Sequence, residues 1–314
     1  MELIRGRHNL RPRHRGCVAT IGSFDGLHLG HRALLDQLAA AGERLDKPCV
    51  VVTFEPLPRE FFRGPDAPPR LTRLGEKIAL LQGTPLDYLL CLRFDAALAR
   101  WPAAAFIEEL LVGQLGIVEL VVGDDFRFGY RGLGDYATLV AAGARFGFAV
   151  RPQATVDIEG GRVSSTRVRS ALAVGDFATA KALLGRPYAI CGRVARGDQL
   201  GRTIGFPTAN VLLKRHRPPL GGVFAVEVEG PWPGRRIGVA NLGRRPTVGG
   251  MRVQLEVHLF DFSGDLYGES VTVVFRHKLR DERRFGSLDE LKAQLQRDAA
   301  GAGEFFAAGA PGPC

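Results

Sequence analysis

The feature that most constrains the fold is an alternation of apolar, β-branched runs with helical patterns, which continues to about residue 185. Apolar runs without polar alternation are typical of strands that are buried on both faces of a parallel sheet. Helices between such strands predict a doubly wound α/β domain. The expected strands are 17–24, 48–55, 87–94 and 117–123, and the expected helices are 31–45, 74–82, 101–112 and 135–146.

The pattern changes near residue 186. Asp176 is a candidate N-cap of a short helix that ends at Leu184, before the stop signals Gly185 and Pro187. Beyond it, short runs separated by glycine-rich turns predict a small antiparallel barrel or sandwich. The expected strands are 189–194, 223–229, 236–242, 253–260 and 270–278. We therefore expect two domains, 1–185 and 186–314, as a length of 314 residues also suggests.

A helix is predicted at the end of the second domain. It begins at Ser287, because the string S-L-D-E allows a capping box with Glu290. The last residues, 299–314, are rich in Ala and Gly, and we expect them to fray.

Composition places the chain among globular proteins, because 46% of its residues are hydrophobic and 24% are charged. Its apolar runs are shorter than the roughly 18–20 residues that span a bilayer, and its N-terminus has no apolar core of a secretory signal. The five cysteines are scattered, without a CxxC pair or a Cys/His cluster. We expect reduced thiols and a cytoplasmic location.

The formal net charge of +9 indicates anionic partners. Nucleic acid is one candidate, and small phosphate-bearing substrates are the other. Runs of five or more Lys or Arg residues are absent, so basic residues are spread rather than clustered. We therefore expect small phosphates rather than nucleic acid or a membrane surface, and the sequence leaves an oligomer open.

The first motif with chemical meaning is the string G-S-F-D-G-L-H-L-G-H at residues 22–31. It leads from an expected buried strand through a glycine-rich turn into a helix, which is a geometry that presents backbone N–H groups and a positive helix end to an anion. His28 and His31 are three residues apart and share one face of the first helical turn. They could donate hydrogen bonds to phosphate oxygens in a transition state. The alternative is a pair of solvated histidines at a helix start.

This motif resembles the H-x-G-H signature of the nucleotidyltransferase superfamily. The whole string resembles the N-terminal module of the bifunctional riboflavin kinase/FAD synthetase family, and the resemblance continues through 53–62, 122–129 and 164–169. It implies a Rossmann-like nucleotidyltransferase domain that binds ATP at the turn. The residues it implies are Gly22, Ser23, Phe24, Asp25 and Gly30 for ATP, His28 and His31 for catalysis, Ser165, Thr166 and Arg169 for phosphates, and Asp125 near the substrates.

One stretch departs from the family pattern. The family has a Lys-Gly-Arg-type stretch after 128–129, whereas here residues 130–135 read Y-R-G-L-G-D. The basic residue Arg131 is displaced by one position, so its contact is open. A flavokinase with a degenerate adenylyl-transfer site is therefore an alternative.

The second domain carries a glycine-rich segment, 192–210, with four glycines and the string P-T-A-N. If residues 207–211 are extended, Thr208 and Asn210 point to the same side. A hydroxyl and an amide oxygen are hard ligands that suit Mg²⁺ carrying phosphates. The alternative is ordinary turn chemistry.

Clean alternation marks the expected strand 253–260, where Val253, Leu255, Val257 and Leu259 face one way and Gln254, Glu256, His258 and Phe260 face the other. Glu256 could accept a proton from a substrate hydroxyl. The alternative is a solvated polar face.

Five segments of this domain resemble the riboflavin kinase module: 192–210, 238–249, 255–262, 265–268 and 279–282. The resemblance implies a six-stranded Greek-key barrel, with Thr208 and Asn210 holding Mg–ATP and Glu256 as catalytic base. Gly197 and Gly205 are further phosphate-binding candidates. Together the two modules imply that riboflavin is phosphorylated to FMN, and that FMN is adenylylated by ATP to FAD with release of pyrophosphate.

A basic RNA-binding protein on a nucleotidyltransferase-like fold is a second alternative. The H-x-G-H string also occurs in class I aminoacyl-tRNA synthetases, but the chain has no K-M-S-K-S-type string.

Overall fold

A computed structural model describes residues 1–309 apart from 198–200, 202–203, 216 and 248–249. Cys314 lies outside the described residues. The chain forms two compact units, of which the first contains Met1–Pro68 and Thr72–Ser164 and the second contains Pro69–Leu71 and Ser165–Cys314. The short piece Pro69–Leu71 packs with the second unit because its carbonyl oxygens accept hydrogen bonds from Arg169, Tyr188 and Arg215.

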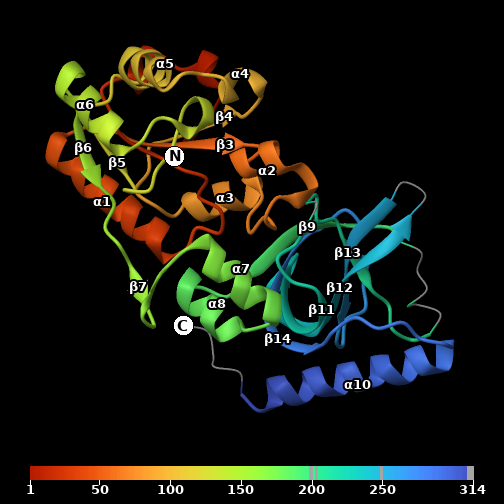
Figure 1. Cartoon of the computed structure of the whole chain (residues 1–314). Coiled ribbons are helices and arrows are strands. Elements are labelled where there is room, and N and C mark those ends of the chain that lie inside the picture. Colours follow the sequence, from red (N-terminus) through yellow and green to blue (C-terminus); the bar gives the residue numbers. More distant parts are fainter. Residues whose placement is uncertain (198–200, 202–203, 216, 248–249, 310–314) are drawn as a thin grey trace. The chain divides into compact units, whose positions relative to one another are not determined.

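The first unit is built on a six-stranded, wholly parallel sheet with the order β1-β4-β3-β2-β5-β6 (Figure 1). The strands are β1 (Glu2–Arg5), β2 (Val18–Ile21), β3 (Cys49–Glu55), β4 (Tyr88–Arg93), β5 (Glu119–Val122) and β6 (Ala149–Pro152). The doubly wound α/β domain is confirmed. Two strands of the sheet, β1 and β6, have no counterpart among the expected strands.

Both faces of the central strands are buried, which explains their continuous apolar sequences. In β3, Val50 and Val52 enter one hydrophobic cluster and Val51 enters another on the opposite face. One cluster is covered by η4 and α6, and the other by α1 and α3. The central strands are therefore apolar at most positions.

Helices and short turns connect these strands. The longer helices are α1 (Leu29–Leu45), α3 (Leu74–Leu81), η4 (Phe106–Gln114, a π-helix) and α6 (Tyr136–Phe146). The shorter elements are η1 (Arg7–Asn9), η2 (Pro12–His14), α2 (Pro58–Arg63), η3 (Gly64–Asp66), α4 (Ala96–Ala99), α5 (Ala103–Ala105), η5 (Tyr130–Gly132), β7 (Asp157–Ile158) and β8 (Gly161–Arg162). The helix expected at 101–112 begins later, at Ala103 after the N-cap Pro102, and continues into η4.

The second unit is a closed barrel of six antiparallel strands in the order β10-β13-β12-β11-β14-β9 (Figure 1). The strands are β9 (Ala189–Ala195), β10 (Ala209–Val211), β11 (Gly222–Gly230), β12 (Trp232–Thr247), β13 (Gly250–Leu259) and β14 (Ser270–Arg280). The barrel expectation is confirmed. Periodicity had indicated five strands, and the three-residue β10 is the one it did not find.

Two helices, α7 (Ser165–Val174) and α8 (Phe177–Leu184), precede the barrel and belong to the second unit. Asp176 caps α8 as expected, because its carboxylate accepts from the Thr179 N–H at 3.0 Å. Phe177 packs against two fully buried barrel residues, with ring centroids 5.8 Å from Phe224 and 6.4 Å from Phe275. This packing does not test the boundary that we expect between the two functional domains, at 185/186, which stays a prediction.

The last helix, α10 (Leu288–Ala307), lies along the barrel (Figure 1). Its expected N-cap is present, since Ser287 Oγ accepts from the Glu290 N–H at 3.2 Å, whereas the Glu290 carboxylate accepts from the Gly286 N–H at 3.0 Å and not from Ser287 as a capping box requires. The expectation that the chain frays from residue 299 is wrong within 299–307, which stay helical. Ala302 is fully buried against Val223 and Ala225, with Phe305 and Phe306 packed beside it, and this apolar contact holds the end of the helix.

Two candidate phosphate-transfer sites

The first candidate site lies where the order of the parallel sheet reverses. The chain runs outward from β2 to β3 on one side, and β5 pairs with β2 on the other. Open α/β sheets bind ligands beyond the carboxyl ends of the strands at such a point. The two segments that follow β2 and β5 here are 22–31 and 123–134, both of which carry motifs singled out in the sequence.

The turn after β2 is held in an unusual backbone conformation. Phe24 has a φ of 48° and Leu27 a φ of 42°, both in the left-handed region that side chains rarely adopt. Both side chains are fully buried in the cluster beneath α1. Because apolar burial compensates the strain, the turn is fixed before any ligand arrives. The expected strand 17–24 ends at Ile21 for the same reason.

Polar contacts to Thr72 fix the centre of this turn. The buried carboxylate of Asp25 accepts from the Thr72 N–H at 2.9 Å and lies 3.3 Å from its hydroxyl. The same hydroxyl accepts from the Gly26 N–H at 3.0 Å. Asp25 therefore supports the turn from inside.

A buried lysine also supports the turn. Lys77 is only 1% exposed, and its Nζ donates to Ser23 O at 2.6 Å and to Thr53 Oγ1 at 3.1 Å. Sequence reasoning missed it, although a signal was present. Residues 74, 77, 78 and 81 have helical spacing, so a lysine at 77 interrupts the apolar stripe of α3.

The two histidines of the motif lie together at the N-terminus of α1. His28 is the N-cap residue, and its Nδ1 accepts from the His31 N–H at 3.3 Å. The imidazoles stack with centroids 3.7 Å apart, and Phe24 lies 5.0 Å from the His31 ring. A side chain on Gly30 would crowd the His28 ring, because a Cβ would lie 3.2 Å from it. The structure thus brings the predicted pair together where the helix end favours an anion.

Other predicted residues of this site are placed less tightly. Gly22 follows β2 directly. Asp125 follows β5 on an exposed loop, 3.6 Å from the Arg162 guanidinium. Arg131 has a left-handed φ of 55°, and its guanidinium lies 5.3 Å from the centre of the Tyr130 ring. Arg131 is exposed, so the displaced basic residue remains accessible.

Ser165, Thr166 and Arg169 lie on the first turns of α7 in the second unit. Arg169 Nε donates to Pro69 O at 2.6 Å within that unit. In the first unit, the buried Val163 places its carbonyl oxygen 3.4 Å from the Cβ position of Gly30.

The second candidate site is a cavity of about 240 Å³ that the barrel and α10 enclose. Strands β10, β13, β12 and β11 supply one wall, and α10 with the segment before it supplies the other. Of the residues predicted for this site, Thr208, Asn210 and Glu256 line the cavity, whereas Gly197 and Gly205 are not among its lining residues. The structure therefore brings the three predicted kinase residues together.

Strand register explains this convergence. Asn210 on β10 is paired with Glu256 on β13, and Glu256 is paired with Asn241 on β12. Directly paired residues project to the same side of a sheet with Cβ atoms about 5 Å apart. A row amide–carboxylate–amide thus crosses three strands, with Thr208 two residues before Asn210. The prediction that one face of the strand is apolar is also confirmed, since Leu255, Val257 and Leu259 are buried.

Asn210 is held in place by its surroundings. The Gln254 amide donates to Asn210 Oδ1, which leaves this oxygen a second lone pair. A Cβ on Gly197 would overlap the Asn210 side-chain amide, so glycine is required there. Gly205 has a φ of 83° in the same segment. Within the described residues no cluster of three or more His, Cys, Asp or Glu that could hold a metal ion is found.

Part of the wall that α10 and the segment before it supply is apolar. Leu288, Leu291 and Leu295 line it from α10 at helical spacing, and Phe285 lines it from the preceding segment. The cavity therefore combines an apolar lining from these residues with proton acceptors from the polar row. A planar aromatic substrate with a polar tail fits such a cavity.

Sequence reasoning missed several cavity residues. They come from β12, the end of β14, the segment between β14 and α10, and α10 itself, and they are Asn241, Arg280, Glu282, Arg283, Phe285 and Asp298. Asn241 and 280–282 fall inside segments that resemble the kinase module, but only strand pairing shows that they face the same space.

The histidine turn of the parallel-sheet unit and the polar row of the barrel together define a class of protein. It is a transferase that uses ATP and acts on small phosphate-bearing substrates. The FAD synthetase family model matches residues 10–167, and the riboflavin kinase family model matches residues 184–306. The chain belongs to the family of bifunctional riboflavin kinase/FMN adenylyltransferases.

Individual relatives agree with this membership. The bifunctional riboflavin kinase/FMN adenylyltransferase of Escherichia coli (strain K12) is 54% identical over 98% of both chains. The enzyme of that name from Pseudomonas fluorescens is 52% identical over 96% of this chain and 97% of its own. A solved structure described as a macrolide-efflux protein from Streptococcus pneumoniae is 31% identical, with a TM-score of 0.80 over 95% of this chain and 97% of that one.

None of the helices in the described part of the chain has both the length and the apolar character needed to cross a membrane.

Proposed function

We propose how the two units divide the two-step synthesis of FAD. The barrel unit phosphorylates riboflavin to FMN with ATP, and the parallel-sheet unit transfers an adenylyl group from a second ATP to FMN and releases pyrophosphate. The observation that carries the proposal is the registered row Asn210–Glu256–Asn241 inside one cavity. It supplies a base and hard oxygen ligands within a single site.

In the kinase step, Glu256 accepts the proton of the riboflavin 5′-hydroxyl as that oxygen attacks the γ-phosphorus of ATP, and ADP leaves. Thr208 and Asn210 would hold Mg²⁺ with the phosphates, and the metal supplies charge neutralisation for the transferred group. Gly197 and Gly205 allow the backbone of the preceding segment to approach the phosphates. Most of the acceleration comes from positioning and electrostatics.

The isoalloxazine ring of riboflavin packs against the apolar wall that α10 supplies. Leu291 and Leu295 contribute this wall, and the ribityl chain extends toward Glu256. Ring burial against leucine side chains provides most of the binding free energy for an uncharged flavin.

In the adenylyl-transfer step, an FMN phosphate oxygen attacks the α-phosphorus of ATP. The turn Gly22–Asp25 and Gly30 bind the nucleotide, while His28 and His31 donate hydrogen bonds to the α-phosphate as its charge develops. Ser165, Thr166 and Arg169 hold the other phosphates, and Asp125 lies near the flavin substrate. FMN is already an anion, so the reaction needs no covalent enzyme intermediate.

The test is chromatography of flavins after the full-length protein is incubated with riboflavin, ATP and Mg²⁺. We expect an FMN peak that rises first and an FAD peak that follows it. FMN without FAD would show the single-activity alternative, in which the displaced Arg131 marks a degenerate site. A chelator should stop both peaks, and persistence of FMN formation in its presence would contradict the metal assignment.

We also propose a cytoplasmic location with reduced thiols. Cys17 and Cys49 are free thiols, and burial raises the pKa of Cys17 to about 12 and that of Cys49 to about 11. Such thiols behave as small apolar side chains.

A further inference from the structure

The geometry points to a polar clamp, a term we use for the hydrogen-bonded group of Arg280, Gln294 and Asp298. This clamp holds the apolar wall of the kinase cavity at a fixed distance from the barrel. It thereby sets the affinity of the cavity for riboflavin. These are positioning residues for the kinase step. The inference rests on the proposal that riboflavin binds in this cavity.

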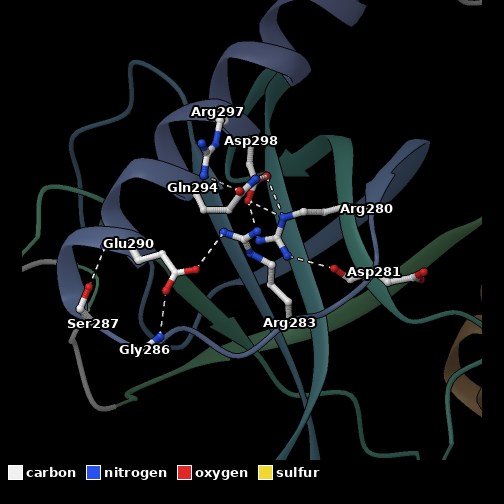
Figure 2. A network of polar contacts seen from close by, with 9 residues as sticks. All are labelled: Arg280, Asp281, Arg283, Gly286, Ser287, Glu290, Gln294, Arg297 and Asp298. Carbon is white, nitrogen blue, oxygen red and sulfur yellow. Dashed lines mark hydrogen bonds and ion pairs between the residues drawn. The ribbon is translucent and has the colours of Figure 1, made fainter.

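The clamp joins α10 to strand β14. Asp298 is only 4% exposed, and its carboxylate accepts from Arg280 Nε at 2.9 and 3.1 Å and from Arg280 Nη2 at 2.7 Å. Gln294, one helical turn earlier, donates to the same carboxylate at 2.7 Å. Figure 2 shows the Asp298 carboxylate and the Gln294 amide pointing from α10 toward the Arg280 guanidinium. Paired, hydrogen-bonded charges of this kind fix both distance and orientation.

Apolar contact cannot do this for the first half of α10. The second half is docked by Ala302, Phe305 and Phe306, which pack on Val223 and its neighbours. In the first half, the side chains at the same helical positions line the cavity instead of a packed core, and Leu288 is 63% exposed. Without a rigid tie, the apolar wall would gain by collapsing onto the barrel or would move away from it.

A second set of contacts fixes the start of the helix. Glu290 accepts from the Gly286 N–H at 3.0 Å and lies 3.4 Å from Arg283 Nη2 (Figure 2). Arg283 and Arg280 both stack on Phe285, with guanidinium-to-ring distances of 4.7 and 5.7 Å. The segment that closes the cavity is thus tied to the clamp through Arg280.

Preorganisation of this wall has a definite kinetic consequence. A wall held open binds flavin without an ordering cost, so loosening the clamp should weaken binding of riboflavin and leave binding of ATP unchanged. A role confined to general stability would instead lower the amount of active enzyme and leave both KM values unchanged.

The experiment compares full-length wild type with Asp298→Asn, which keeps the shape of the side chain and removes its charge. We expect the KM for riboflavin and its Kd from flavin fluorescence to rise about tenfold or more, because hydrogen bonds to a charged group are lost. The KM for ATP should stay within about twofold, and FAD formation from supplied FMN should be unchanged, since none of the residues proposed for that step belongs to the clamp.

Arg280→Lys is the second variant, because it keeps the positive charge and loses the forked geometry. It should raise the riboflavin KM in the same direction and to a smaller extent. In the double variant Arg280→Met with Asp298→Leu, the riboflavin KM should be closer to wild type than in Asp298→Ala, because an unpaired buried charge is worse than an apolar pair.

The matched control is Glu229→Gln, which removes an exposed ion pair with Arg235 (2.7 Å) on the barrel and does not line the cavity. It should leave both KM values unchanged. The inference is overturned if Asp298→Asn and Arg280→Lys leave the riboflavin KM at the wild-type value, or if ATP and riboflavin KM values rise together. Wild type that forms no FMN from riboflavin would overturn the proposed kinase function itself.

Discussion

At the scale of single residues, the motif side chains depend on buried polar partners that lie far away in sequence. Lys77 reaches the turn after β2 from α3, and Thr72 reaches it from the loop before that helix. The H-x-G-H motif could be identified from sequence because its residues are contiguous. The partners could not, because only the fold brings them to the turn.

Lys77→Met should impair FMN adenylylation by about a hundredfold, because loss of the bonds to Ser23 O and Thr53 Oγ1 lets the turn shift relative to α1. Riboflavin phosphorylation by the same preparation should be unchanged. Initial rates of FAD formation from FMN and of FMN formation from riboflavin measure the two effects. The control is Lys47→Met at an exposed lysine, which should alter neither rate. Equal loss of both rates would contradict this role.

Burial raises the pKa of the Cys17 thiol from 9.0 to about 12, so the folded state favours the neutral thiol. Its stabilisation is complete below about pH 9 and is lost as the pH rises from 9 toward 12. Between pH 8 and 10, the free energy of unfolding of wild type should fall by about 1 kcal/mol more than that of Cys17→Ala. Urea unfolding at both pH values measures it. The same comparison between pH 6 and 8 should show no difference, and an equal decline in both proteins above pH 8 would refute the assignment.

At the scale of elements, caps and strand pairing account for what the sequence could and could not predict. The caps Asp176 and Ser287 are local in sequence, and both were predicted correctly. The three-residue strand β10 has too few residues to show a period, and it exists because it pairs with β9 and β13. The Ala- and Gly-rich end of α10 has weak helix propensity, and it is helical because Ala302 packs on the barrel.

Asp176→Ala should lower the free energy of unfolding by about 1 kcal/mol at pH 7, because it removes the N-cap of α8. Hydrogen bonds from Thr179, through its side chain and then its backbone N–H, hold the pKa of Asp176 below its usual 3.8. The contribution is therefore present above pH 3.8 and is lost as the pH falls through the lower folded pKa. Urea unfolding should show the deficit shrinking below pH 3.8, and Asp176→Asn, which can still cap, should cost less at pH 7. A deficit that does not change with pH would contradict the charge effect.

At the scale of the whole molecule, the two fold types and the two sets of motifs could be predicted from the sequence, since each depends on patterns within one unit. Three parts of the kinase site could not be predicted from the sequence. Asn241 faces Glu256 only through strand register, Asp298 meets Arg280 only through docking of α10, and the cavity exists only between those elements. The motif residues themselves could thus be predicted from the sequence, whereas their partners are identified by the described structure.

The central claim is that one chain contains two separate phosphate chemistries, each with its own residues. Glu256 belongs to the barrel unit, whereas His28 and His31 belong to the parallel-sheet unit. A change in either set should therefore stop one step and spare the other.

The most direct measurement is chromatography of the flavins formed by full-length Glu256→Gln and by the double variant His28→Ala with His31→Ala, each given riboflavin or FMN with ATP and Mg²⁺. We predict that Glu256→Gln forms no FMN from riboflavin and still converts supplied FMN to FAD. The double histidine variant should accumulate FMN from riboflavin and form no FAD. Loss of both activities in either variant, while it retains the wild-type melting temperature, would contradict the account.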